Sequence, residues 1–343
     1  MSGPSGTADD QGPLRIGRPR DWLLGMLLLV GLVIAVHYGI GWGKLMAPWR
    51  EFSPWLLLWL FLLTAASYVM RAVRVSRYFR PRFDGRFPVM LRLTILHNTA
   101  NNLMPMRTGE MAFPWLMRRY FGQGFLDSAA ALLWIRLLDM HCLALLAIYI
   151  LDLSHPSWIW WFLGAFWLAG LAGLPLFGAL ARTRALAGEG RLRTILRRVL
   201  LAAPRDGWLI LQIYCLTLLI WGFKFAAFTS VLAFFLPVDV WRVLTGVMGA
   251  ELSSVLPFHG IAGSGSYELA AVAALVPLGI DPQLALAGAV NLHLFLLGTT
   301  LILGGLAFLL PRRMAEDTSR RSSGAGAASA GTTFVARRSE DQC

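Results

Sequence analysis

The sequence predicts an all-α integral membrane protein with six full transmembrane helices plus two broken-helix hairpins in inverted orientation. The chain of 343 residues is 57% hydrophobic and only 15% charged, with a mean hydropathy of +0.59. Its apolar runs repeatedly reach about 20 residues, the length that a helix needs to cross a hydrocarbon core of about 30 Å. Two further apolar stretches are interrupted by polar residues, proline and glycine, and these predict the hairpins.

The arginines account for a formal net charge of +12. In a soluble protein this charge would suggest nucleic-acid binding. Here the arginines gather in two short blocks and at the chain ends, where the positive-inside rule explains them, so we expect no nucleic-acid partner. Cys142 and Cys215 lie inside apolar runs, Cys343 is the last residue, and no ligand spacing occurs. We therefore predict no disulfide, no metal and no cofactor.

The N-terminal composition predicts the first two helices. Residues 1–20 are rich in Gly, Pro and Ser and predict a disordered cytoplasmic tail. The apolar run Trp22–Ile40 exceeds a signal-peptide core and lacks a small-residue cleavage pattern, so we expect a signal anchor. Pro54–Met70 is the second predicted span and returns the chain to the cytoplasm. The block Arg71–Arg86 predicts a cytoplasmic loop, whose arginines are either solvated or bind anionic lipids of the inner leaflet.

Polar residues interrupt the hydropathy over Pro88–Tyr120, the first broken hairpin, which has to return to the cytoplasm if later loops obey the same charge rule. Two full spans follow, Ala129–Leu151 and Ile159–Leu180. The second arginine-rich block comes next. Within it apolar residues recur at helical spacing opposite arginines, which predicts an amphipathic helix lying on the inner leaflet. These residues are Leu192, Ile195, Leu196, Val199 and Leu200.

Another span, Trp208–Leu236, precedes the second broken hairpin, formed by Val243–Leu256 and Tyr267–Gly279. Leu284–Leu310 is the last span, and residues 312–343 predict a second disordered cytoplasmic tail. The count of crossings places both termini in the cytoplasm. It also opens the first hairpin to the cytoplasm and the second to the outside, an arrangement that recurs in transporters. Alternatively, each arm of a hairpin crosses the whole membrane. This alternative leaves the loops that follow on the same side of the membrane.

The first hairpin carries amide side chains, then proline, arginine, glycine and a carboxylate. Backbone groups freed by Pro105 and Gly109 have to be buried in protein or line an aqueous cavity, because lipid offers no hydrogen bonds. This favours a polar cavity over kinks sealed by neighbouring helices. Arg107 either holds a phosphate with its planar fork while Glu110 orients it, or pairs structurally with Glu110, or snorkels to the interface. Further cavity candidates are Asn98, Asn101 and Asn102.

The second hairpin repeats this pattern over residues 251–268. Its hinge candidates are Pro257, Gly260, Gly263 and Gly265. Two carboxylates, Glu251 and Glu268, suit a cationic headgroup or proton coupling, with His259 able to titrate near neutral pH. An ordinary hydrogen-bonding role is the alternative for His259. Tyr267 adjoins Glu268 and completes the candidates in this hairpin.

Three charged residues interrupt the full spans. Arg136 and Asp139 stand three residues apart, the spacing of an intrahelical ion pair, and isolated charges at this depth are costly. We expect both to face the cavity. Lys224 has no charged neighbour in its own span, so it needs a partner such as Glu251, Glu268 or a lipid phosphate.

The stretches NNLMPMRTGE and LPFHGIAGSGSYE together resemble the paired motifs of the flippase-like integral membrane family, similar to the membrane domain of lysylphosphatidylglycerol synthases. The resemblance covers Trp22–Leu310, within a predicted membrane domain of residues 21–311. It implies movement or binding of a lipid-linked substrate. The bifunctional synthases append a large soluble aminoacyl-transfer domain to this membrane domain. In this sequence the predicted membrane domain is followed by the predicted disordered tail, so we do not expect lysine transfer. The resemblance carries as motif positions Asn102, Pro105, Arg107, Gly109, Glu110, Pro257, Gly263 and Glu268.

These observations predict a translocase of a membrane lipid or lipid-linked glycan that binds a phosphate-bearing headgroup between the hairpins, in a bacterial inner membrane. We expect no enzymatic activity. The alternatives are a non-transporting lipid-binding scaffold for an envelope-assembly enzyme and an intramembrane lipid-phosphate transferase. The sequence holds no nucleotide-binding motif of a primary pump, and no nucleophile-base pair or metal-carboxylate cluster of a transferase.

Overall fold

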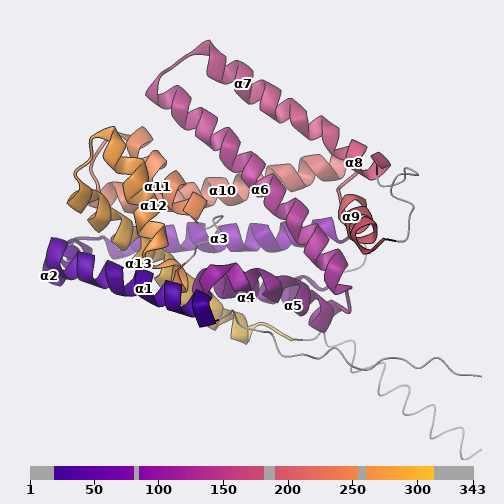
Figure 1. Ribbon diagram of the computed structural model, residues 1–343, viewed down its shortest axis with the longest axis horizontal. Coiled ribbons are helices and arrows are strands. Elements are labelled where there is room, and N and C mark those ends of the chain that lie inside the picture. Colours follow the sequence, from indigo (N-terminus) through magenta and orange to yellow (C-terminus); the bar gives the residue numbers. More distant parts are fainter. Residues whose placement is uncertain (1–18, 81–84, 181–189, 254–259, 313–343) are drawn as a thin grey trace, which may run out of the picture.

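The computed structural model describes residues 19–80, 85–180, 190–253 and 260–312, and no strand occurs among them (Figure 1). The all-α membrane class is thereby confirmed. Seven helices are long and apolar enough to cross a membrane. They comprise the six predicted spans and the second arm of the second hairpin, so the division into six spans and two hairpins stays a prediction. The seven are Trp22–Ile40, Pro54–Tyr78, Phe125–Ser154, Trp158–Phe177, Gly207–Phe235, Ile261–Leu278 and Pro282–Leu309.

Helix α1 (Pro19–Ala35) continues into a π-helical turn, η1 (Val36–Ile40). The connection to the next span holds two short helical turns, α2 (Trp42–Met46) and η2 (Ala47–Arg50). There Leu45 is buried, and Trp49 Nε1 donates to Asn291 Oδ1 over 2.7 Å. The connection is therefore anchored to the last long helix.

Helix α3 (Pro54–Tyr78) begins with proline at its first turn, where the missing N–H has no helical partner to lose. It continues beyond Met70, the predicted end. The prediction that a cytoplasmic loop begins at Arg71 is therefore wrong. Arg71 and Arg74 are buried inside the helix bundle, because they continue an inward polar face that already holds Thr64 and Ser67.

The first hairpin consists of α4 (Phe87–Leu103), the 3-10 helix η3 (Pro105–Met111) and α5 (Ala112–Phe121). At 1.5 Å per residue, α4 is about 25 Å long and α5 about 15 Å, both shorter than a hydrocarbon core of about 30 Å. Pro105 stands in the first turn of η3. A Cβ on Gly109 would lie 2.4 Å from the backbone carbon of Ala100, so only glycine lets η3 pack directly on α4.

Helices α6 (Phe125–Ser154) and α7 (Trp158–Ala169) form an antiparallel hairpin that projects from the bundle (Figure 1). Helix α7 has no buried residue. It continues through η4 (Gly170–Gly173) into α8 (Leu174–Leu180). The predicted amphipathic segment forms α9 (Arg191–Leu201), which is fastened to α6 because Trp134 Nε1 donates to the carbonyl of Val199 over 2.7 Å.

The C-terminal half begins with α10 (Gly207–Phe235), whose first turn is capped by Asp206. The second hairpin follows as α11 (Val240–Ser253), η6 (Ile261–Gly263), α12 (Ser266–Leu275) and η7 (Val276–Leu278). The last span is α13 (Pro282–Leu306) with η8 (Ala307–Leu309). Buried Arg92 of α4 donates to carbonyls at the end of this span, among them that of Ala307 at 3.0 Å, and thereby satisfies groups that a helix end leaves unpaired.

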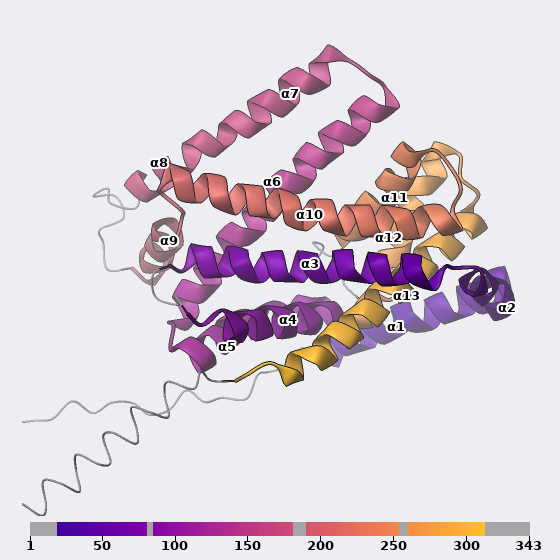
Figure 2. The ribbon, with the colours of Figure 1, turned by 180° about the vertical axis from the view of Figure 1, so that it is seen from behind.

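Helices α3 and α10 run side by side through the middle of the molecule in both views (Figure 2). The largest apolar core lies around α10, α11 and α13. Helix α1 contacts both broken segments, η3 and η6. Gly265 at φ +84° would place a Cβ 2.8 Å from the carbonyl oxygen of Leu28, so glycine is needed there for both conformation and space. The broken segments η3 and η6 also contact each other.

Candidate functional site

A cavity of about 60 Å³ lies where the two hairpins meet helices α3, α6, α10 and α13. We call it the polar cavity. Eight residues singled out from the sequence line it: Asn98, Asn101, Asn102, Arg136, Lys224, Glu251, Gly263 and Tyr267. Five others complete the lining: Arg71, Trp221, Ala262, His293 and Leu296. The structure thus brings together seven of the twelve predicted substrate-binding residues and the predicted hinge residue Gly263, from segments far apart in the chain.

An ion pair between α3 and α6 lies directly behind the cavity. Arg74 Nη1 is 2.6 Å from Asp139 Oδ1, and Arg74 Nη2 is 3.3 Å from Asp139 Oδ2, with both side chains almost fully buried. Helix α10 joins this pair, because Arg74 donates to Thr217 Oγ1 over 2.8 Å and Trp221 Nε1 donates to Asp139 over 3.1 Å. The ion pair of Arg74 with Asp139 therefore connects the three helices α3, α6 and α10.

Arg136 connects α6 to the first hairpin. Its Nη2 lies 2.7 Å from Glu110 Oε1, whereas its Nη1 is 3.6 Å from Asp139 Oδ2. The predicted intrahelical pair of Arg136 with Asp139 is confirmed, but each has a closer partner in another element. Glu110 is not among the lining residues and instead holds Arg136 in place. His97 adds a weaker contact, its Nε2 lying 3.9 Å from Glu110 Oε2.

Lys224 of α10 pairs with Glu251 of the second hairpin, its Nζ lying 2.5 Å from Glu251 Oε2. This confirms one of the partners predicted for Lys224. The Tyr267 hydroxyl lies 3.5 Å from the other oxygen of Glu251. Each hairpin is thus joined to a long span by an ion pair, the first through Glu110 and Arg136 of α6 and the second through Glu251 and Lys224 of α10.

Glu268, which the sequence predicts to bind substrate, does not line the polar cavity. It is 1% exposed, and its Oε2 accepts the backbone N–H of Gly265 over 2.8 Å, which caps α12. Its Oε1 lies 2.5 Å from His293 Nδ1, and His293 Nε2 is 2.9 Å from the carbonyl of Ala262. Both ring nitrogens of His293 therefore lie within hydrogen-bond distance of an oxygen atom.

Arg71 differs from the other cations at this site. Among the described residues, the three cationic side chains Arg74, Arg136 and Lys224 each have a carboxylate within ion-pair distance. Arg71 lines the cavity without one, and its guanidinium carbon lies 5.5 Å from the centre of the Trp221 ring. A buried guanidinium held against an aromatic face is poorly compensated electrostatically, so the cavity favours an anion there.

The three asparagines of α4 supply further polar groups to the lining of the cavity. Asn98 Nδ2 donates to the carbonyl of Thr94 over 2.7 Å, and Asn102 Nδ2 donates to Thr300 Oγ1 over 2.9 Å. Asn101 Oδ1 is buried without a hydrogen-bond partner. Because a buried amide oxygen normally finds a donor, Asn101 is a position at which a ligand or water gains a hydrogen bond.

Some of the predicted positions lie outside the described residues. These are Pro257, His259 and the side chain of Arg107, whose predicted roles stay predictions. Gly260 is described, and a Cβ there would lie 2.1 Å from the carbonyl oxygen of Ser264, which explains why glycine stands at this break. The predicted tails also lie outside, except for their innermost residues.

A family model described as lysylphosphatidylglycerol synthase TM region matches residues 22–304, which confirms the resemblance inferred from the two motifs. Comparison with curated proteins and with solved structures gave no match.

Proposed function

Because the chain belongs to the lysylphosphatidylglycerol synthase transmembrane family, a family of membrane lipid-related proteins, we propose that it is a translocase of a membrane lipid or lipid-linked glycan. The polar cavity binds the phosphate of the headgroup. The lipid is the substrate, no enzymatic step is involved, and the protein resides in a bacterial inner membrane with both termini in the cytoplasm.

The observation that carries this proposal is Arg71, a buried guanidinium that lines the cavity with no carboxylate partner among the described residues. A guanidinium presents a planar fork of donors that matches two phosphate oxygens at once. Arg136 and Lys224 line the same space, so a phosphate there meets three cations whose charge is only partly neutralised.

The size of the cavity limits what it holds in this state. About 60 Å³ holds a few water molecules or one small anion, and it is too small for a sugar-bearing headgroup. Larger substrates therefore require one hairpin to move away from the long spans. Movement of the first hairpin breaks the Glu110–Arg136 pair, and movement of the second breaks the Lys224–Glu251 pair. Opposite opening of two broken hairpins is the transport cycle expected for inverted repeats.

Helix α9 suits contact with anionic lipids of the inner leaflet. Its apolar residues Leu192, Ile195 and Leu196 are exposed, as expected for a stripe that enters the membrane interface. Its arginines lie beside them in sequence and attract anionic headgroups. An envelope-assembly enzyme is the protein partner that we propose to receive the translocated lipid.

The test is translocation of fluorescent phosphatidylglycerol by the purified full chain in liposomes, read as the fraction protected from an externally added quencher. Arg71→Met should abolish translocation because the unmatched cation is lost. Arg71→Lys should retain part of it, since the charge remains but the bidentate fork does not. Arg77→Met is the matched control, because Arg77 lies on the same helix outside the cavity lining.

Two results would contradict the proposal. Translocation by Arg71→Met at the wild-type rate would exclude a role of Arg71 in phosphate binding. If the wild-type chain binds phosphatidylglycerol in an Arg71-dependent manner but moves none across the bilayer, the lipid-binding scaffold explains the protein better than the translocase does.

A further inference from the structure

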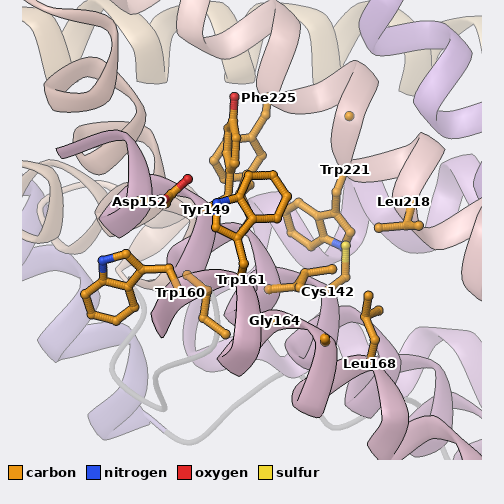
Figure 3. Close-up of a pocket in the computed structure, with 15 residues that line it drawn as sticks. Cys142, Tyr149, Asp152, Trp160, Trp161, Gly164, Leu168, Leu218, Trp221 and Phe225 are labelled. Atoms are coloured by element: carbon orange, nitrogen blue, oxygen red, sulfur yellow. The ribbon is translucent and has the colours of Figure 1, made fainter. Parts of the chain in front are cut away.

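A second space, larger than the polar cavity, lies between α6, α7 and α10 (Figure 3). We call it the apolar groove. Its volume is about 510 Å³, within the range of about 300–1,000 Å³ that ligand pockets occupy. Its walls are aliphatic and aromatic side chains together with Cys142 and Gly164, and its only carboxylate is Asp152, at the end of α6. Such a lining suits a hydrocarbon ligand and offers nothing to a polar one.

The apolar groove and the polar cavity share one residue, Trp221 of α10. Its ring centre lies 5.5 Å from the guanidinium carbon of Arg71 and 5.4 Å from Lys224 Nζ. The indole N–H is fixed by Asp139 over 3.1 Å. One aromatic ring therefore adjoins the cations of the polar cavity and also forms part of the groove wall, so Trp221 stands at the boundary between the two spaces.

The groove has the length of one leaflet. Along α6 its lining extends from Cys142, near the middle of the helix, to Asp152 at its end. These positions are about 15 Å apart at 1.5 Å per residue, which is half of a hydrocarbon core of about 30 Å. Trp160 and Trp161 lie at the far end, beside the α6–α7 turn (Figure 3).

Helix α7 forms one wall of the groove and is fastened at the opposite end. His141 of α6 and Trp167 of α7 stack with ring centres 4.9 Å apart. Two hydrogen bonds join the same residues, from Trp167 Nε1 to the carbonyl of His141 over 3.0 Å and between His141 Nε2 and the carbonyl of Trp167 over 2.9 Å. The groove is therefore a formed feature between two attached helices.

We propose that the apolar groove binds one hydrocarbon chain of the lipid whose phosphate occupies the polar cavity, with the chain extending from Trp221 toward the α6–α7 turn. This inference rests on the proposed function and adds the substrate class: a phospholipid or other long-chain phosphate ester. A phosphate in the polar cavity places the start of its chain near Trp221. The groove then continues from that point without a charged side chain until Asp152.

The direction of the chain separates this proposal from ordinary lipid contact. A bulk lipid beside α7 keeps its headgroup at the membrane surface near the α6–α7 turn, and its chain ends near Trp221. The proposed lipid has the opposite direction. The position of a label along the chain therefore identifies which lipid occupies the groove.

The experiment uses the full chain in phosphatidylcholine nanodiscs with two photoreactive phosphatidylglycerols, one carrying a diazirine beside the acyl carbonyl and one at the chain end. We expect the first probe to label peptides containing Cys142 and Trp221, and the second to label those containing Tyr149 and Trp160. The reverse order would overturn the proposal. Equal labelling by a diacylglycerol with the same diazirine chain would also overturn it, because that probe has no phosphate.

A substitution at Gly222 tests the same point independently. A Cβ on Gly222, which lines the groove, has no atom within 4 Å, so Gly222→Leu extends a side chain into the groove from a position where the Cβ itself meets no neighbour. Gly298→Leu is the matched control, since Gly298 of α13 is equally open and lies outside the groove. Labelling by the chain-end probe should fall at least tenfold in Gly222→Leu and stay unchanged in Gly298→Leu. Unchanged labelling in Gly222→Leu would overturn the proposal.

A third probe distinguishes the two proposals. It is a dihexanoyl phosphatidylglycerol with the diazirine on its glycerol headgroup, which should label α3 and α10 near Arg71 and Lys224 in the wild type and in Gly222→Leu. If this probe fails to label the polar cavity, the proposed function fails. If it labels the cavity while the chain probes do not follow the groove in the expected order, only the groove inference fails. Should Gly222→Leu not fold, the order of the labels in the wild-type chain still decides.

Discussion

The buried pair between Arg74 and Asp139 allows a quantitative test of how the charged interior stabilises the bundle. Asp139 is fully buried and accepts from Arg74 over 2.6 Å and from Trp221 over 3.1 Å. Asp139→Leu leaves the guanidinium of Arg74 without its carboxylate, and Arg74→Met leaves the carboxylate without its main donor. Removal of one partner of a buried ion pair typically costs about 3–5 kcal/mol, and we expect each single variant to lose that much.

The double variant Arg74→Met, Asp139→Leu should be more stable than either single variant. Replacement of both partners by apolar residues of similar volume removes both charges of the pair, so neither is left buried without the other. What remains is the Trp221 N–H without an acceptor, which costs about 1–3 kcal/mol. Thr217 keeps a hydrogen bond, because its hydroxyl also donates to the carbonyl of Ile213 over 2.8 Å.

The assay is the free energy of unfolding in mixed micelles, followed by tryptophan fluorescence, for the wild type, both single variants and the double variant. The control cycle uses Arg242 and Asp239, a pair at 3.4 Å whose side chains are 35% and 63% exposed. Exposed pairs contribute at most about 1 kcal/mol, so that cycle should show little coupling. Additivity of the Arg74 and Asp139 variants within about 0.5 kcal/mol would refute the reasoning, because independent sites behave in that way.

Two further predictions concern topology and the close packing of the hairpins. In a chain whose native cysteines are replaced, cysteines near Arg80 and Arg193 should react with an impermeant reagent from the cytoplasm, and those near Lys44 and Asp281 from the outside. Reaction of the Arg80 and Asp281 positions from the same face would show that the inverted orientation is wrong. Gly109→Ala should destabilise the protein by about 1–3 kcal/mol in the same unfolding assay, because its Cβ would lie 2.4 Å from the backbone of Ala100. Gly305→Ala, with no atom within 4 Å of its Cβ, should be neutral or stabilising, and equal effects of the two substitutions would contradict the packing explanation.

Hydropathy predicted the long helices well, since a membrane requires about 20 apolar residues for each crossing. It failed at the end of α3, where the inner face becomes charged before the helix ends. Thr64, Ser67, Arg71 and Arg74 follow one helical face, a pattern visible in the sequence. The positive-inside rule assigned the two arginines to a loop because it considers composition and does not ask which face of a helix a residue occupies.

The charged site was predictable where the cost of an isolated charge demands a partner, as for Lys224 with Glu251. The pairing of Arg136 with Glu110 was not predictable, because Asp139 offered an equally suitable partner three residues away. His293 was missed altogether. A single histidine in an apolar helix has no neighbour in sequence that marks it, and its contact with Glu268 exists only once α12 and α13 pack together.

In the proposed function, the pattern of ion pairs links phosphate binding to hairpin movement. Glu110 in η3 and Glu251 in α11 each hold a hairpin against a long span through one cation, Arg136 or Lys224. Both cations line the polar cavity beside Arg71. A phosphate that enters the cavity therefore competes with Glu110 and Glu251 for the cations that keep the hairpins in place, whereas a lipid without an anionic headgroup leaves both pairs intact. A scaffold that only retains lipid has no need for its ligand to weaken these pairs, but a translocase does, because each hairpin has to leave its long span in turn for the headgroup to pass.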